Sequence, residues 1–163
     1  MSGVENVSGG RFFSPTERIT IPAYVREIID RLNSRGFSAY AVGGAVRDCA
    51  LGLSPDDWDV ASSALPEEIE STFSDFRVIE TGIKHGTVSV VTGGNAVEIT
   101  TFRKESGYSD NRHPDAVEFV GDIAEDLRRR DFTVNSLAYN EKDGLIDLYG
   151  GLSDIQNKIV RAV

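Results

Sequence analysis

The sequence has one cysteine, and it has no long apolar run. Cys49 is the single cysteine among 163 residues, so a disulfide within the chain is excluded, which fits a reducing cytoplasm. No apolar stretch approaches the roughly 18 residues that a membrane-spanning helix needs. The N-terminus also lacks the charged start and apolar core of a signal peptide. We therefore expect a cytoplasmic protein with no membrane partner.

Several common site patterns are missing as well. The two histidines, His85 and His113, have no second histidine or cysteine at ligand spacing, so the sequence predicts no zinc site. No Ser-His-Asp or Cys-His arrangement can be argued, and the phosphate-binding pattern G-x-x-x-x-G-K-[ST] does not occur. We interpret Cys49 as a small buried helix residue.

An excess of positive charge is also absent. The formal net charge is −9 and the isoelectric point is near 4.7, which argues against a simple nucleic-acid-coating domain. Cations still cluster locally, most strongly at Arg128-Arg129-Arg130. Part of the acidic excess is explained if some carboxylates bind metal.

The length and the hydrophobic periodicity predict one domain with a mixed β-sheet and flanking helices, in the α+β or α/β class, of which we choose α+β. Residues 1–20 are rich in Gly and Ser and lack periodicity, so we expect a loose N-terminal tail. We expect helices at 22–35, 45–51, 66–73, 123–137 (with a break near 131–132) and 152–158. We expect strands at 37–42, 58–61, 76–80, 87–92, 96–102, 116–120, 137–140 and 145–148. The polar stretch 103–115 is interpreted as a flexible loop.

The stretch 40–61 carries the first functional signal. Gly43-Gly44 separates an apolar strand from a helix, which lets the backbone approach a ligand closely. Arg47 follows in the first turn of that helix, where a cation opposes the helix dipole and is easier to explain if it meets a phosphate. The alternative is an ordinary strand–turn–helix joint.

Carboxylates provide the second signal. Asp57 and Asp59 alternate with Trp58 on an expected strand, so both carboxylates leave the same face. Their repulsion becomes tolerable if a divalent cation lies between them, and oxygen ligands suit Mg²⁺. For an isolated D-x-D, surface turn residues are the more frequent explanation. Glu98 would make a third acid if its strand lies beside that of Asp59.

Other cations are candidates for phosphate contact. Arg130 suits a triphosphate because a guanidinium fork matches phosphate oxygens. For Arg128 we favour a solvated helix face. The turn Lys84-His85-Gly86 is a further candidate for phosphate contact.

Seven motifs occur in a family-specific order and spacing. They are GGAVRD (43–48), DWD (57–59), HGTV (85–88), VEITTFR (97–103), RHPD (112–115), EDLRRRDFTVNSLA (125–138) and IDLYGGLSDI (146–155). The chain resembles the N-terminal catalytic head domain of class II tRNA nucleotidyltransferases and the related bacterial poly(A) polymerases, in the polymerase-β-like nucleotidyltransferase superfamily. The resemblance runs from about Tyr40 to the end of the chain.

The resemblance implies Mg²⁺-dependent, template-independent transfer of CMP and AMP from CTP and ATP to the 3′ end of tRNA. It further implies that the loop at 103–115 is a mobile segment, and we expect the head alone to be a monomer. The roles that it implies are metal binding and catalysis by Asp57 and Asp59, a third acid at Glu98, and nucleotide binding by Gly43, Gly44, Arg47 and Arg130.

The resemblance also divides the chain. Residues 21–150 correspond to the head, and 151–163 begin a connector to a neck and body. The family's base-selecting helix lies C-terminal to the head, so we expect this chain, which ends at Val163, to be the catalytic head of a longer protein. Two alternatives remain: a poly(A) polymerase with the same chemistry, and a non-catalytic nucleotide-binding module.

Overall fold

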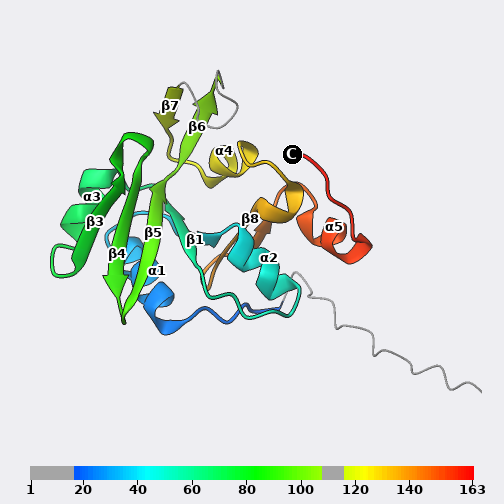
Figure 1. Ribbon diagram of the computed structural model, residues 1–163, viewed down its shortest axis with the longest axis horizontal. Coiled ribbons are helices and arrows are strands. Elements are labelled where there is room, and N and C mark those ends of the chain that lie inside the picture. The colour runs from blue at the N-terminus through cyan, green and yellow to red at the C-terminus, as the bar shows by residue number, and fades with distance from the viewer. Residues whose placement is uncertain (1–16, 108–115) are drawn as a thin grey trace, which may run out of the picture.

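The computed structural model describes residues 17–107 and 116–163 and forms one seven-stranded sheet and one two-stranded ribbon (Figure 1). The sheet has the strand order β3-β4-β5-β2-β1-β8-β9, and β6 pairs with β7 in the ribbon. The strands are β1 (Ala39–Val42), β2 (Asp59–Ser62), β3 (Arg77–Gly82), β4 (Thr87–Thr92), β5 (Asn95–Thr101), β6 (Arg103–Ser106), β7 (Ala116–Phe119), β8 (Leu137–Asn140) and β9 (Gly144–Asp147).

Five α-helices and two 3₁₀ helices accompany the strands in the described residues. They are α1 (Ala23–Ser34), α2 (Gly44–Ala50), α3 (Pro66–Thr72), α4 (Ile123–Arg128), α5 (Gly151–Asn157), η1 (Ile83–His85) and η2 (Thr133–Asn135). This arrangement confirms the α+β class with a mixed sheet. No helix in the described part of the chain is long and apolar enough to cross a membrane.

Local sequence explains the best-predicted elements. In α1, Val25, Ile28, Ile29 and Leu32 recur at helical spacing and are all buried. The β-branched segments of β4 and β5 form the predicted antiparallel hairpin around Gly93 and Gly94, both of which have positive φ.

The pairing of β2 with β5 makes the sheet mixed. These two strands run parallel, with Asp59 aligned with Glu98, whereas the other paired strands of the sheet run antiparallel. On its other side β2 pairs with β1, which aligns Asp59 with Val42. Val42, Asp59 and Glu98 therefore form a row across three neighbouring strands.

The two faces of the central strands bury different clusters. The larger cluster contains Val60 and Ile99 with side chains from α1 and α3, and Figure 1 shows these two helices behind the strands. The smaller cluster contains Val42, Ala61 and, from α4, Leu127. Since side chains alternate along a strand, Asp59 and Glu98 share the face of the smaller cluster. The face opposite α1 and α3 is thus the face available for chemistry.

Several expected boundaries are wrong. Residues 103–106 were expected in a loop but form β6, where Arg103 aligns with Phe119 of β7. The helix expected over 123–137 ends at Arg128, because Phe132 is extended (φ −120°, ψ 146°) and the chain then forms η2. The break expected near Asp131-Phe132 is confirmed.

Two further differences concern the ends of segments. Asp57 precedes β2 instead of lying on it, although the alternation of exposed Asp57 and Asp59 with buried Trp58 is retained. Ile19 is 4% exposed and packs in the larger cluster, so the last residues of the expected tail belong to the packed domain. The RHPD motif at 112–115 lies outside the described residues.

Candidate active site

The acidic side of the candidate site is built by β2 and β5. Asp59 begins β2 and aligns with Glu98, which confirms that the two strands are neighbours. Glu98 is exposed between the buried Val97 and Ile99, so the face that carries it is open to solvent. Asp57 is exposed two residues before Asp59.

The charges on this side interact. Burial raises the pKa of Asp59, the charges of Asp57 and Glu98 raise it further, and Arg130 acts in the opposite direction. Like charges close to a partly desolvated carboxyl favour its protonated form. Asp59 therefore experiences the field of both other predicted acids.

The carboxylates of the acidic side do not form a complete set of metal ligands. Within residues 17–107 and 116–163, no group of three or more His, Cys, Asp or Glu side chains is arranged to hold a metal ion. The expected convergence of three acids is therefore realised as an in-register pair, Asp59 and Glu98, with Asp57 nearby, and not as a tight three-ligand cluster.

The glycine turn faces an arginine in this structure. Gly43 has φ +71° and ψ −136°, and its N–H donates to the carbonyl of Leu137 at 3.1 Å. A Cβ on Gly43 would lie 3.2 Å from Nη1 of Arg130. Glycine is thus favoured here by its left-handed backbone angle, and a side chain would also crowd the guanidinium of Arg130.

Arg47 has partners within the protein. Its Nε and Nη2 contact Oδ1 of Asp48 at 2.9 and 2.8 Å, and its Nη1 donates to Oδ1 of Asn135 at 2.7 Å. A phosphate is therefore not needed to explain this cation near the start of α2, contrary to the argument from the helix dipole alone. The side chain is still 34% exposed and remains reachable by a ligand.

Arg130 is held by a buried acid. Its Nη2 lies 3.3 Å from Oδ2 of Asp126, whose side chain is fully buried. Burial lowers the pKa of Arg130, and the charge of Asp126 offsets this shift most strongly. A guanidinium pKa starts high enough that Arg130 remains a cation at neutral pH.

A cavity of about 330 Å³ joins the two sides. It is lined by five of the seven predicted site residues, Gly43, Gly44, Arg47, Asp59 and Arg130. Its remaining lining residues are Arg129, Asp131 and Asn135. Asp57 and Glu98 do not line this cavity, and they lie on the acidic side beyond it.

Sequence reasoning missed Asp131 and Asn135. Both lie within EDLRRRDFTVNSLA, so the motif was found but these side chains were not singled out. Asn135 is brought to Arg47 by η2, a contact between residues 88 positions apart. Local periodicity carries no signal for such a contact.

The turn at 83–86 does not reach the cavity. Lys84 and His85 are exposed and are not among its lining residues. Gly86 is in the left-handed region (φ +80°), and a Cβ there would collide with the ring of Phe119. The turn therefore has a packing role against β7, and phosphate contact by its side chains stays a prediction.

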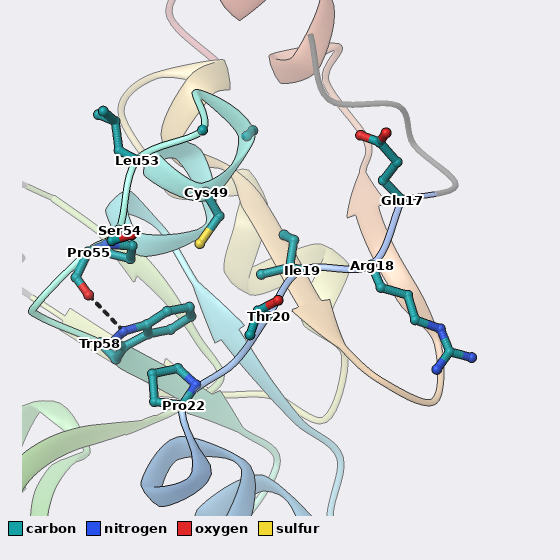
Figure 2. A pocket seen from close by; sticks show the side chains of 12 residues that line it. Glu17, Arg18, Ile19, Thr20, Pro22, Cys49, Leu53, Ser54, Pro55 and Trp58 are labelled. Atoms are coloured by element: carbon teal, nitrogen blue, oxygen red, sulfur yellow. Dashed lines mark hydrogen bonds between the residues drawn. The ribbon is translucent and has the colours of Figure 1, made fainter. Parts of the chain in front are cut away.

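A larger cavity of about 760 Å³ lies elsewhere, beside Trp58 and Cys49 (Figure 2). Its lining contains none of the predicted site residues, and Trp58 donates from Nε1 to the carbonyl of Pro55 at 3.2 Å. Cys49 is half-buried, and burial followed by the charge of Asp48 raises the pKa of its thiol. Trp58 thus faces this cavity while its neighbours Asp57 and Asp59 are exposed.

The fold and the motifs together define the class. The chain belongs to the poly A polymerase head domain family, whose pattern matches residues 39–161. Nucleotidyltransferases of this polymerase-β-like group typically use a divalent metal ion.

Particular relatives are CCA-adding enzymes. The chain is 54% identical over 136 residues to the CCA-adding enzyme of Ligilactobacillus salivarius (strain UCC118), covering 83% of this chain and 33% of that protein. It is 49% identical over 147 residues to the CCA-adding enzyme of Limosilactobacillus fermentum (strain NBRC 3956 / LMG 18251), covering 88% of this chain and 36% of that protein. The chain thus spans about a third of the length of these curated relatives.

Solved structures agree with the fold. The Bacillus stearothermophilus CCA-adding enzyme in complex with CTP matches with a TM-score of 0.75 and 43% identity, over 85% of this chain and 32% of that chain. A tRNA nucleotidyltransferase complexed with a primer tRNA and an incoming ATP analog matches with a TM-score of 0.65 and 31% identity. The match covers 83% of this chain and 38% of that chain.

Proposed function

We propose that this chain is the catalytic head of a CCA-adding tRNA nucleotidyltransferase, which adds CMP and AMP from CTP and ATP to the 3′ end of tRNA. The observation that carries the proposal is the cavity that brings the Gly43-Gly44 turn, Arg47 and Arg130 beside Asp59. The CTP complex of the similar Bacillus stearothermophilus enzyme supports the choice of nucleotide. The primer tRNA in the similar nucleotidyltransferase complex supports the choice of acceptor.

The proposed cofactor is Mg²⁺, held by Asp57 and Asp59. Two nearby carboxylates without a third protein ligand suit this ion, which keeps waters and completes its shell with substrate phosphates. When bound, Mg²⁺ supplies charge neutralisation on the triphosphate and activation of the attacking hydroxyl.

The protein's own residues bind and orient the reactants. In the proposed reaction the tRNA 3′ oxygen forms a bond to the α-phosphorus, and the bond from that phosphorus to the bridging oxygen breaks, releasing pyrophosphate. Glu98 orients the hydroxyl and accepts its proton. Arg47, Arg130 and the Gly43-Gly44 backbone bind triphosphate oxygens and offset the charge that develops on the leaving group.

The domain assignment follows from this proposal. Residues 21–150 form the nucleotidyltransferase head, and residues 151–163 lead toward the part of the protein that selects the base and grips the RNA. We further propose that the head alone is a monomer and that the protein acts in the cytoplasm, where tRNA matures.

Product analysis tests the function. The complete protein is given CTP and ATP together with a tRNA that lacks its terminal CCA, and the products are sequenced. A bounded CCA end is expected. An open A tract would identify a poly(A) polymerase instead. No incorporation, with Mg²⁺-dependent nucleotide binding intact, would identify a non-catalytic module.

A further inference from the structure

We propose that Asp126 is a positioning residue for Arg130, and that it links this arginine to the base of the β6–β7 ribbon. The inference rests on the proposed function, in which Arg130 binds the triphosphate. Asp126 does not line the site cavity. It acts on the ligand through the guanidinium that it holds.

The contacts of Asp126 come from two elements. Its Oδ2 accepts from Nη2 of Arg130 at 3.3 Å, and its Oδ1 accepts from Nε of Arg129 at 3.1 Å. Oδ1 also accepts from the backbone N–H of Arg103, the first residue of β6, at 3.1 Å. One carboxylate therefore fixes the end of α4 and the start of the ribbon together, and Figure 1 shows α4 beside the base of that ribbon.

Burial makes these contacts obligatory. The Asp126 side chain is fully buried, and a buried carboxylate is costly unless charge and hydrogen bonds compensate it. Arg129 and Arg130 follow Asp126 at positions i+3 and i+4, in the turn just after α4 ends at Arg128, and both side chains bond back to the Asp126 carboxylate. The spacing of EDLRRRD thus supplies both cations from the same turn.

Arg130 depends on Asp126 for its orientation. The Nε of Arg130 is buried and has no hydrogen-bond partner within residues 17–107 and 116–163, while its Nη1 lies against Gly43. Asp126 is the one carboxylate bonded to the Arg130 side chain among the residues that the structure describes. Loss of this acceptor would release the guanidinium from the geometry in which it faces the cavity.

A second set of ion pairs, made by Glu105, also connects the ribbon to the end of α4. Glu105 of β6 binds Arg103 at 2.7 Å and Arg129 at 3.1 Å through Oε1, and its side chain is 8% exposed. Arg103, Glu105, Arg129 and Asp126 therefore form a continuous ionic chain that ends at Arg130. This chain of ion pairs connects the base of the ribbon to the arginine that is proposed to bind the triphosphate.

A double-mutant cycle on CTP binding tests the proposal. The dissociation constant for CTP with Mg²⁺ is measured by calorimetry on the complete protein for wild type, Asp126→Asn, Arg130→Ala and the double variant. Arg130→Ala is expected to weaken binding roughly 10- to 100-fold, as for loss of hydrogen bonds to a charged group. Asp126→Asn is expected to weaken binding measurably, by up to about tenfold, and the double variant should bind no more weakly than Arg130→Ala alone.

Controls separate positioning from general damage. Glu125→Gln makes the same chemical change at the neighbouring α4 residue, whose carboxylate pairs with Lys104 at 3.7 Å, and it should bind CTP as wild type does. Melting temperatures are recorded for every variant. If Asp126→Asn does not fold, Asp126→Glu keeps the buried charge and is put through the same cycle.

The outcomes are distinct. Additive losses in the double variant, or wild-type binding by a folded Asp126 variant, would overturn the positioning role. Wild-type binding by Arg130→Ala would instead overturn the proposed triphosphate role of Arg130, on which the inference depends.

Discussion

The acidic side of the candidate site (Asp57, Asp59 and Glu98) and its basic side (Arg47 and Arg130) differ in how their charges are compensated within the protein. On the acidic side, Asp57 and Glu98 raise the pKa of Asp59, so like charges meet without a closed set of protein ligands. On the basic side, Arg47 and Arg130 are each bonded to protein acceptors. The basic side is preorganised before a ligand arrives, whereas the acidic side gains from a cation supplied from solution.

From this difference we expect the basic side to contribute mainly to nucleotide affinity and the acidic side mainly to the chemical step. A fixed guanidinium binds phosphate oxygens without further ordering, which favours affinity. A cluster of repelling carboxylates gains most when charge is neutralised, which favours a metal and the chemical step. Variants on the acidic side should therefore lower kcat, and variants on the basic side should raise KM.

The largest effect is expected at Asp59. Asp59→Asn should lower the rate of CMP incorporation at least about 1,000-fold, because several kcal/mol of transition-state stabilisation depend on the metal that it is proposed to hold. Single-turnover incorporation into tRNA measures this. Asp56→Asn, at an exposed turn position, is the matched control and should remain active. Normal turnover by Asp59→Asn would contradict the proposed metal role of Asp59, and with it the assignment of the chemical step to the acidic side.

A smaller effect is expected at Arg47. Arg47→Lys keeps the charge but cannot reproduce the contacts to Asp48 and Asn135, so KM for CTP should rise about tenfold with a lesser change in kcat. Arg128→Lys, at an exposed position, should leave both constants unchanged. A fall in kcat alone would assign Arg47 to the chemical step.

Gly43 tests how tightly the basic side is packed. Gly43→Ala places a side chain at φ +71° and 3.2 Å from Arg130, so a loss of about 1–3 kcal/mol of stability is expected together with weaker CTP binding. Gly52→Ala is the matched control, because Gly52 has φ +75° but open space around it. Chemical denaturation and calorimetry separate the two properties. Equal loss of CTP binding in both variants would contradict the role of the Arg130 contact.

The smallest effect concerns stability without metal. Because the pKa of Asp59 is raised in the folded protein, the folded state holds this proton more tightly, and stability falls as pH rises through the folded pKa. Asp59→Asn removes that loss, so its melting temperature at pH 7 without Mg²⁺ should exceed that of wild type by less than about 2 °C. Thermal unfolding across pH measures the difference, which should shrink as pH falls through the raised folded pKa and vanish below about 4, the unfolded value. A lower melting temperature in Asp59→Asn at pH 7 would mean that Asp59 stabilises the fold.

The sequence predicted the elements that local patterns determine. The apolar periodicity of α1 and the β-branched hairpin of β4 and β5 arise within single segments, and the structure confirms both. Alternation predicted that Asp57 and Asp59 leave the face opposite Trp58, and the structure has both exposed and Trp58 buried. The sequence could not predict that Glu98 lies near Asp59, because this proximity depends on the parallel pairing of two strands that are far apart in the chain.

The features that escaped prediction arise from tertiary contacts. The segment 103–106 is polar, and β6 exists because it pairs with β7 and because Arg103 and Glu105 are held by ion pairs. The same holds for Asp126, whose role depends on a backbone N–H 23 positions earlier in the chain. A charged stretch such as EDLRRRD reads as a solvated helix face until its burial is known.

The parallel pairing of β2 and β5 also has a consequence for folding. The segment between Asp59 and Glu98 contains α3, β3 and β4, so the contact between the two acids has a long sequence separation. Such a contact of long sequence separation forms late relative to the β4–β5 hairpin. A partly folded chain in which β2 and β5 are unpaired therefore lacks the aligned acidic pair, and a ligand that binds only this pair would stabilise only molecules in which the two strands have paired.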